Sequence, residues 1–122
     1  MGHVDGLLDD AAHDPRWGAF CVVVDGRLVA NAGFFGPPDV SGEAEIGYSV
    51  CLVARRRGIA TAIVAELCRR AAELGCASVR AHTREDNAGS VGALVRNGFT
   101  MADTGGVGDQ RVLVLRRSTS GG

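Results

Sequence analysis

The sequence predicts an α/β fold with a mixed, mostly antiparallel sheet of about six strands and two main helices. Three observations support this prediction. The length of 122 residues suits one domain with one core. Apolar residues make up 46% and charged residues 22%, as in ordinary globular proteins. Strand-like alternation at both ends of the chain flanks a helical apolar stripe, and we expect the order β-β-β-α-β-α-β-β. We expect a single domain over residues 1–122, with a weakly structured lead at 1–16 and a disordered tail at 118–122.

The first half of the chain predicts three strands. Residues 17–24 are almost entirely apolar, and Asp25-Gly26 is typical of a two-residue hairpin turn. Residues 27–35 are therefore expected to run back antiparallel, until Gly36-Pro37-Pro38-Asp39 breaks the strand. The third strand is expected at residues 43–50. One side of it would carry Glu43, Glu45, Gly47 and Ser49, and the other Ala44, Ile46, Tyr48 and Val50.

The period changes in the second half. Ile59, Ile63, Leu67 and Ala71 are four residues apart and predict an amphipathic helix of about 16 residues, with Gly75 as its C-terminal stop. A short strand at 77–83 follows. A second helix is expected at 87–97, ended by Gly98. Two more strands at 99–104 and 110–116, joined by the glycine-rich residues 105–109, complete the sheet.

The charges exclude several functions. All 13 basic residues are arginine, which excludes Schiff-base chemistry and a P-loop, since both need lysine. Arginine favours forked recognition of anions. The net charge of −1 argues against nucleic acid or an anionic membrane as a partner. Residues 1–50 carry −6 and residues 51–122 carry +5, so a phosphate-bearing ligand is expected to find its counter-charges in the second half.

The four cysteines predict neither a metal site nor disulfides. Cys21, Cys51, Cys68 and Cys76 form no C-x-x-C pair and no cluster with zinc spacing. The sequence shows no signal peptide and no long apolar span. We therefore expect reduced, mostly buried thiols in a cytoplasmic protein without a metal, and we read Cys51 as a packed thiol.

A loop with phosphate-binding character precedes the first helix. It reads Arg55-Arg56-Arg57-Gly58-Ile59-Ala60-Thr61. A helix start offers unpaired N–H groups and a partial positive charge, and small residues allow a phosphate to approach the backbone closely. Three arginines add charge, although a solvated basic loop has the same composition.

The loop is part of a larger resemblance. The segment Glu45-Ile46-Gly47-Tyr48-Ser49-Val50, followed by Arg55-x-x-Gly58-x-Ala60-Thr61, resembles the acetyl-CoA signature of the GCN5-related N-acetyltransferase (GNAT) family. Asn87-x-x-Ser90 and Gly98-Phe99 resemble the later helix motif of that family, in the same order. The likeness extends from about residue 17 to residue 116. The segment Ala-Glu-Ile-Gly-Tyr is similar to the corresponding segment in the branch that includes ribosomal-protein N-terminal acetyltransferases.

The resemblance implies a GNAT-like sheet and acetyl transfer from acetyl-CoA, as co-substrate, to a primary amine by direct attack in a ternary complex. The acceptor would be a small molecule or a peptide. Glu45 would be the general base, and Ser90 would lie at the reacting sulfur. The implied CoA-binding residues are Val50, Arg55, Arg56, Arg57, Gly58, Ile59, Ala60, Thr61, Asn87 and Ser90.

The residues leave several alternatives open. Glu45 can equally be a solvated strand carboxylate, Glu43 on the same side is the alternative base, and His82 reads most simply as an exposed histidine. Leu94 stands where many family members carry a tyrosine as the general acid, Arg56 replaces a usual glycine and Leu52 a usual proline. Only 16 residues precede Trp17, where the family usually has further elements. A homodimer that covers the apolar strand at residues 20–24 is therefore expected, and a non-catalytic acyl-CoA-binding module is the rival function.

Overall fold

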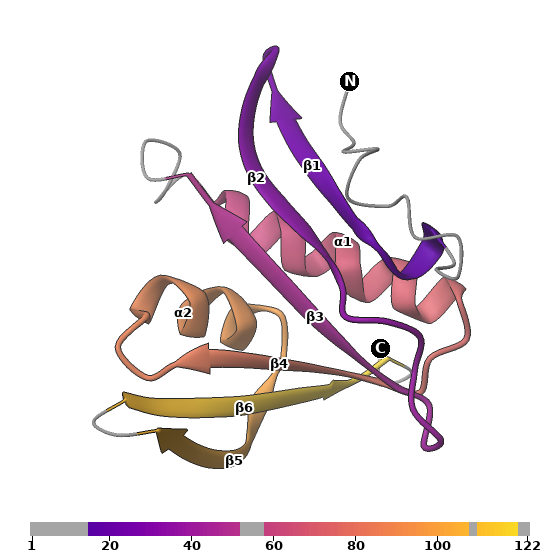
Figure 1. The fold of residues 1–122 in the computed structure, drawn as a ribbon, viewed down its shortest axis with the longest axis vertical. Helices are drawn as coiled ribbons and strands as arrows, with labels where there is room; N and C mark the ends of the chain where they lie inside the picture. The colour runs from indigo at the N-terminus through magenta and orange to yellow at the C-terminus, as the bar shows by residue number, and fades with distance from the viewer. Residues whose placement is uncertain (1–14, 52–57, 108–109, 120–122) are drawn as a thin grey trace.

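The computed structural model describes residues 15–51, 58–107 and 110–119, which form one six-stranded sheet and two α-helices (Figure 1). The strand order is β1-β2-β3-β4-β6-β5. Only β3 and β4 pair in parallel, and all other neighbours are antiparallel. The elements are β1 (Ala19–Val24), β2 (Arg27–Phe34), β3 (Glu43–Val50), α1 (Ile59–Glu73), β4 (Ser78–Arg84), α2 (Ala88–Arg96), β5 (Thr100–Val107) and β6 (Gln110–Ser118). The predicted fold class and element order are confirmed.

The turns form where glycine was expected to allow them. Asp25 and Gly26 both have positive φ, 51° and 79°, which is the conformation of the tight hairpin turn predicted between β1 and β2. Gly75 and Gly98 follow α1 and α2 with φ of 86° and 87°, and so end both helices in the left-handed region.

The boundaries of the first strand differ from the prediction. Pro15–Trp17 form a short 3-10 helix, so β1 begins at Ala19. Trp17 is buried, and its ring meets Phe34 edge-on at a centroid distance of 5.3 Å. The indole therefore anchors the entry to the sheet. Residues 1–14 of the expected lead lie outside the described residues.

The C-terminal hairpin is longer than predicted. β5 extends to Val107 and β6 extends to Ser118, so residues 105–107 belong to a strand and not to a loop. The expectation of a disordered tail from residue 118 is wrong for its first two residues. Ser118 closes β6, and the N–H of Thr119 donates to the carbonyl of Ala77 at 3.1 Å. Pairing with β4 explains the longer strand.

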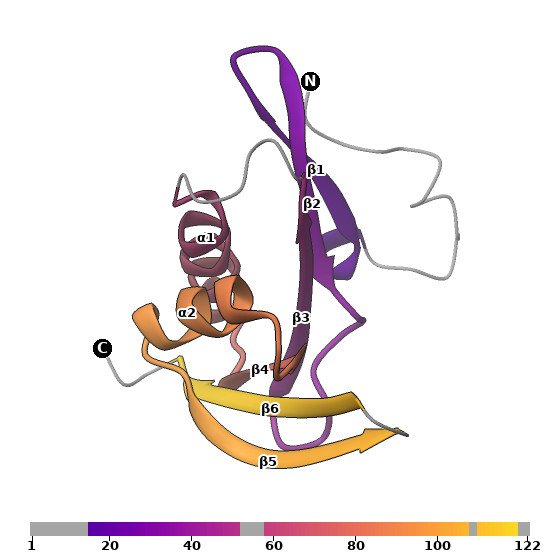
Figure 2. The same ribbon diagram turned by 90° about the vertical axis from the view of Figure 1, so that its left-hand side faces the viewer.

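Both helices lie on the same side of the sheet (Figure 2). The core lies between them and the strands, and its largest fully buried side chains are Ile46, Leu67, Leu94, Leu115, Val64 and Val79. No α-helix in the described parts of the chain covers the opposite side, which we call the open face. Side chains at alternate positions of β3 and β4 therefore face two different environments.

The two central strands separate along their length. Parallel pairing between β3 and β4 runs from Glu43 with Ser78 to Ile46 with Ala81 and ends there. β3 nevertheless continues to Val50, and β4 continues to Arg84. Residues beyond Ile46 and Ala81 thus border a gap in the middle of the sheet, with α1 starting after one strand and α2 after the other (Figure 1).

Candidate active site

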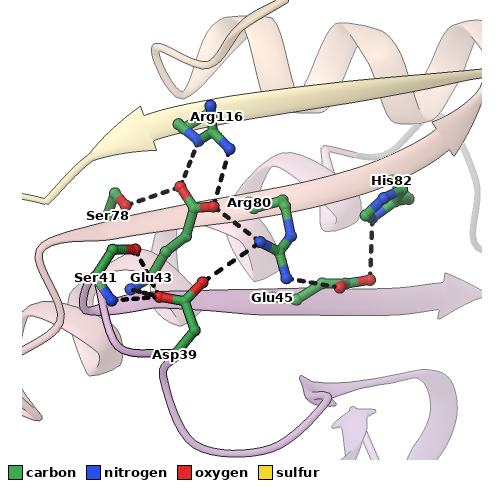
Figure 3. A network of polar contacts seen from close by, with 8 residues as sticks. All are labelled: Asp39, Ser41, Glu43, Glu45, Ser78, Arg80, His82 and Arg116. Carbon is green, nitrogen blue, oxygen red and sulfur yellow. Dashed lines mark hydrogen bonds and ion pairs between the residues drawn. The ribbon is translucent and has the colours of Figure 1, made fainter. Parts of the chain in front are cut away.

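A charged network occupies the open face at the closed end of this gap (Figure 3). The network joins neighbouring strands, because Glu43 and Glu45 come from β3, Arg80 and His82 from β4 and Arg116 from β6. Arg80 is central: it donates to Glu43 at 2.9 Å and to Glu45 at 3.2 Å. The expected placement of Glu43 and Glu45 on one side of β3 is confirmed.

Glu43 is a buried structural carboxylate. Its side chain is 5% exposed and accepts hydrogen bonds from Ser78 at 2.9 Å and from two nitrogens of Arg116. Burial opposes its ionisation, yet the hydrogen bonds from Arg116 and Ser78 and the charges of Arg116 and Arg80 together lower the pKa of the Glu43 carboxyl. Glu43 does not suit the role of alternative base, because every oxygen of this carboxylate is already occupied by a donor.

Glu45 is the accessible carboxylate of the pair. Its side chain is 26% exposed, and one oxygen lies 3.0 Å from Nδ1 of His82. His82 belongs to β4, and its side chain is 44% exposed, in agreement with the exposed histidine that the sequence indicated. A histidine whose Nδ1 is held by a carboxylate presents Nε2 outward. The contact between Glu45 and His82 depends on the register between β3 and β4, which the sequence alone does not give.

A second polar contact bridges the gap from the helix side. The hydroxyl of Tyr48 lies 2.9 Å from Oγ of Ser90 and 3.3 Å from the carbonyl oxygen of Ser90. Tyr48 packs its ring against the core, as its predicted side of β3 requires. Burial raises the pKa of the Tyr48 phenol, while the Ser90 contact works in the opposite direction. The phenol therefore stays protonated at neutral pH.

Asn87 and Ser90 are held by the start of α2. Asn87 is the N-cap, and its side-chain oxygen accepts the N–H of Ser90 at 3.1 Å. Such a cap stabilises the first turn of a helix by about 1 kcal/mol. Asn87 is exposed and Ser90 is half-buried, so the cap fixes Ser90 toward Tyr48.

The expected phosphate-binding loop is described only from Gly58 onward. Arg55, Arg56 and Arg57 lie outside the described residues. Gly58 is the N-cap of α1 with φ 74°, it provides no side-chain cap, and a Cβ built on it meets no atom within 4 Å. The first turn, with Ile59, Ala60 and Thr61, contains no acidic residue. Backbone and charge at this helix start therefore suit an anion.

One residue near the gap, Phe35, was not singled out from the sequence. Phe35 is 72% exposed, and a Cβ on Gly47 would lie 2.6 Å from Cε2 of its ring. The missing side chain at Gly47 therefore leaves room for the Phe35 ring over β3. The N–H of Phe35 donates to the carbonyl of Glu45 at 2.9 Å, which places the aromatic group beside the accessible carboxylate. The sequence shows an aromatic residue and a glycine, but only the strand register brings Phe35 over Gly47.

The remaining predicted positions are more peripheral. Val50 ends β3, is half-buried and is paired with Ala30 of β2. Cys51 is exposed, so its expected packing is wrong, and its thiol donates to the Leu28 carbonyl oxygen at 3.7 Å. Cys68 and Cys76 are buried, and burial raises the pKa of both thiols. All four cysteines are free.

The described residues contain no group of three metal-ligating side chains, and none of their helices has the length and hydropathy needed to cross a membrane. A cavity of about 730 Å³ lies away from the gap, between β1 and α1. Its walls include Phe20, Val22, Ile59, Ile63 and Arg70. This cavity follows from the position of β1 at the edge of the sheet and contains none of the predicted catalytic residues.

Comparison with known families assigns this architecture. The sequence matches the family described as "Acetyltransferase (GNAT) family" over residues 3–99, which is most of the chain. The chain belongs to the GNAT family. As a GNAT protein it is an acetyl-CoA-dependent N-acetyltransferase, and the resemblance seen in its motifs is confirmed. No curated protein matches the GNAT chain significantly.

Solved structures share the GNAT fold at low identity. An N-acetyltransferase from Staphylococcus aureus Mu50 has a TM-score of 0.74 at 19% identity, over 84% of this chain and 68% of its own. The ribosomal-protein-alanine N-acetyltransferase of Brucella melitensis has a TM-score of 0.71 at 22% identity, over 83% and 68%. RimJ of Mycobacterium smegmatis, solved with CoA-disulfide, has a TM-score of 0.78 at 24% identity, over 93% of this chain but 58% of RimJ.

Proposed function

We propose that this GNAT domain transfers the acetyl group of acetyl-CoA to a primary amine that arrives on the open face, with Glu45 as the general base. The position of Glu45 carries this proposal. Its accessible carboxylate lies one residue before β3 and β4 stop pairing, on the face that no α-helix of the described residues covers. An amine on that face meets the carboxylate at the closed end of the gap.

The helix side of the gap suits the CoA substrate. The pyrophosphate would be held at the start of α1 by Arg55, Arg56, Arg57, Gly58, Ile59, Ala60 and Thr61. Two observations support that role: Gly58 is left-handed with no atom of the described residues within 4 Å of a Cβ built on it, and the first turn of α1 contains no acidic residue. The pantetheine arm would lie along β3 as far as Val50 and contact Asn87 and Ser90 at the start of α2.

Glu45 would remove a proton that otherwise blocks attack. An alkylamine has a pKa of about 10.4 and is almost entirely ammonium at neutral pH, a form without a free electron pair. The carboxylate accepts one proton, and the neutral nitrogen then attacks the carbonyl carbon. Such a base contributes about 10²–10⁴ to the rate. Arg80 and His82 hold the carboxylate at the correct position, because each binds a different oxygen of Glu45.

The open face offers groups that an acceptor with a primary amine would contact. Phe35 offers an exposed ring next to Glu45, and the carboxylates and arginines of the network provide both charge signs. A small molecule or a peptide carrying a primary amine fits this surface. The similarity to ribosomal-protein acetyltransferases favours a peptide amine as the first candidate to be tested.

Residues 1–122 would work as a single domain in the cytoplasm, and a second copy would cover the edge strand β1. Among the described residues β1 pairs only with β2, and its apolar side chains border the cavity beside α1. Arg70 lies over the Phe20 ring at 4.3 Å, which leaves an apolar and cationic edge for a partner copy.

Thiol release from acetyl-CoA, followed with and without a panel of amines, tests the function. The panel should contain peptide N-termini, lysine, polyamines and aminoglycosides. Release that depends on one class of amine supports the proposal and names that class. CoA binding by calorimetry without release for any amine would contradict it, and would favour a non-catalytic acyl-CoA-binding module.

A further inference from the structure

This domain lacks the side chain that many of its relatives would use to protonate the leaving thiolate. Leu94 stands at that position of α2, and it is fully buried among core residues. A leucine has no proton to give. Another hydroxyl that borders the gap between β3 and β4 can take this role.

The described residues offer one hydroxyl pair at this place. Tyr48 projects from β3 beyond the last paired residue, Ile46, and Ser90 lies in the first turn of α2. Their oxygens are 2.9 Å apart, so the pair connects the two elements that border the gap. We infer that Tyr48 and Ser90 together form the proton donor to the leaving CoA thiolate, with Ser90 at the sulfur and Tyr48 acting through it. This inference rests on the proposed acetyl transfer.

The local environment favours donation over ionisation. Tyr48 is half-buried and packs against the core, and this burial raises the pKa of its phenol, so that the hydroxyl keeps its proton. Among the described residues no ionisable side chain hydrogen-bonds to the phenol oxygen, whose partners are the two oxygens of Ser90. Asn87 fixes the Ser90 backbone, so the donor is oriented before substrate arrives.

The proton balance is simple. Glu45 takes one proton of the ammonium and passes it to water, and the neutral nitrogen then attacks so that the nitrogen–carbon bond forms. Glu45 takes the second proton from that nitrogen, and the carbon–sulfur bond breaks with its electron pair on sulfur. Ser90 passes its hydroxyl proton to sulfur and receives the proton of Tyr48. The Tyr48 oxygen then regains a proton from water, and Glu45 releases one to water. No oxidant or further reactant is needed.

A test that requires no acceptor measures the thiol of bound CoA itself. A hydroxyl that donates to sulfur stabilises the thiolate, so the thiol of CoA in the wild-type complex is expected to titrate at lower pH. Thiolate absorbance of CoA bound to Tyr48→Phe should show a thiol pKa higher by about one unit, the value of one hydrogen bond to a charge. Ser90→Ala should raise it at least as much. Ser49→Ala removes a neighbouring hydroxyl on the other side of β3 and should leave the titration unchanged.

Kinetics provide the second readout. With an amine that the wild type acetylates, Tyr48→Phe should lower kcat by about 10²-fold, the lower end for acid catalysis, and leave KM for acetyl-CoA unchanged. The double variant should be no slower than Ser90→Ala, because the two hydroxyls act as one unit.

The outcomes separate this inference from the proposed function. An unchanged thiol titration and full kcat in Tyr48→Phe would overturn the role of Tyr48. A loss confined to Ser90→Ala would assign the proton to Ser90 alone and also overturn it. A wild type that binds CoA but acetylates no amine would remove the proposed function and this inference together.

Discussion

Nδ1 of His82 lies 3.0 Å from the carboxylate of Glu45, so the two groups on the open face form a carboxylate–imidazole pair across adjacent strands. A pair of this kind fixes the orientation of both members. Both groups are candidates for the base that deprotonates the amine. Conservative substitution of Glu45 and of His82, one at a time, distinguishes between them.

We predict that Glu45→Gln lowers acetyl transfer by about 10²–10⁴ near neutral pH, because the amide cannot take a proton but can still accept from Arg80. The affinity for CoA should hardly change. The deficit should shrink at high pH, where water deprotonates the amine. Steady-state rates across a pH series, combined with calorimetry of CoA binding, provide the measurement.

His82→Asn is the control for this assignment. The asparagine amide can still donate to Glu45, whereas the outward nitrogen of the imidazole is lost. If Glu45 is the base, this variant should keep its rate within about tenfold, well short of a general-base loss. A collapse as deep as that of Glu45→Gln would move the proton acceptor to His82 and leave Glu45 as its positioning residue.

We predict that Gly58→Asp weakens CoA binding by more than about tenfold, because a negative charge at the start of α1 repels phosphate. Gly58→Asn is the matched variant, since asparagine has nearly the same shape and tolerates the positive φ of 74°. It should bind CoA better than the aspartate variant. Equal affinities for the two variants in calorimetry would show that the phosphates bind elsewhere.

Acid should destabilise the domain through Glu43. The folded-state pKa of Glu43 is lowered from its usual 4.5, so its contribution to stability is complete above that value and is lost as the pH falls through the folded pKa. Glu43→Gln should lower the free energy of unfolding at pH 7 by about 1–3 kcal/mol, because it removes charged hydrogen bonds from a buried group.

Urea unfolding of both proteins at several pH values measures this effect. The difference between wild type and Glu43→Gln should decrease below pH 4.5. A constant difference across the series would mean that Glu43 stabilises the fold by its shape and not by its charge.

We predict that Phe35→Ala changes the use of the acceptor and leaves acetyl-CoA almost unaffected. Its exposed ring lies over Gly47 and beside Glu45, but it makes no contribution to the helix side of the gap. KM for the amine should rise several-fold, and KM for acetyl-CoA should stay constant. Phe35→Leu keeps an apolar side chain and should behave more like the wild type. A rise in KM for acetyl-CoA alone would contradict the placement of the acceptor on the open face.

Much of the fold was predictable because local signals agreed with the final packing. The Asp25-Gly26 turn, the four-residue spacing of the α1 stripe and the glycine stops each define an element without help from distant residues. Strand ends were less predictable. β5 and β6 are longer than predicted because they pair with each other, and this pairing overrides the turn propensity of glycine at positions 105 and 106.

The chemistry of the site was predictable only in part. The alternation along β3 placed Glu43 and Glu45 on the same side, but it could not separate a buried carboxylate from an accessible one. That distinction depends on Arg80 and Arg116, which come from other strands. The contact between Tyr48 and Ser90 and the contact between Phe35 and Gly47 have the same origin, because both depend on tertiary register.

The cluster around Glu43 also has a mechanical consequence. It binds β3, β4 and β6 together at the end where the central strands are still paired. Ion pairs therefore clamp the sheet at one end, and from there β3 and β4 diverge to end at Val50 and Arg84. The diverging halves of these strands are held on their outer sides, because Val50 pairs with Ala30 of β2 and Arg84 pairs with Val112 of β6. The gap therefore has fixed walls, and the ion pairs at its closed end hold Glu45 in place.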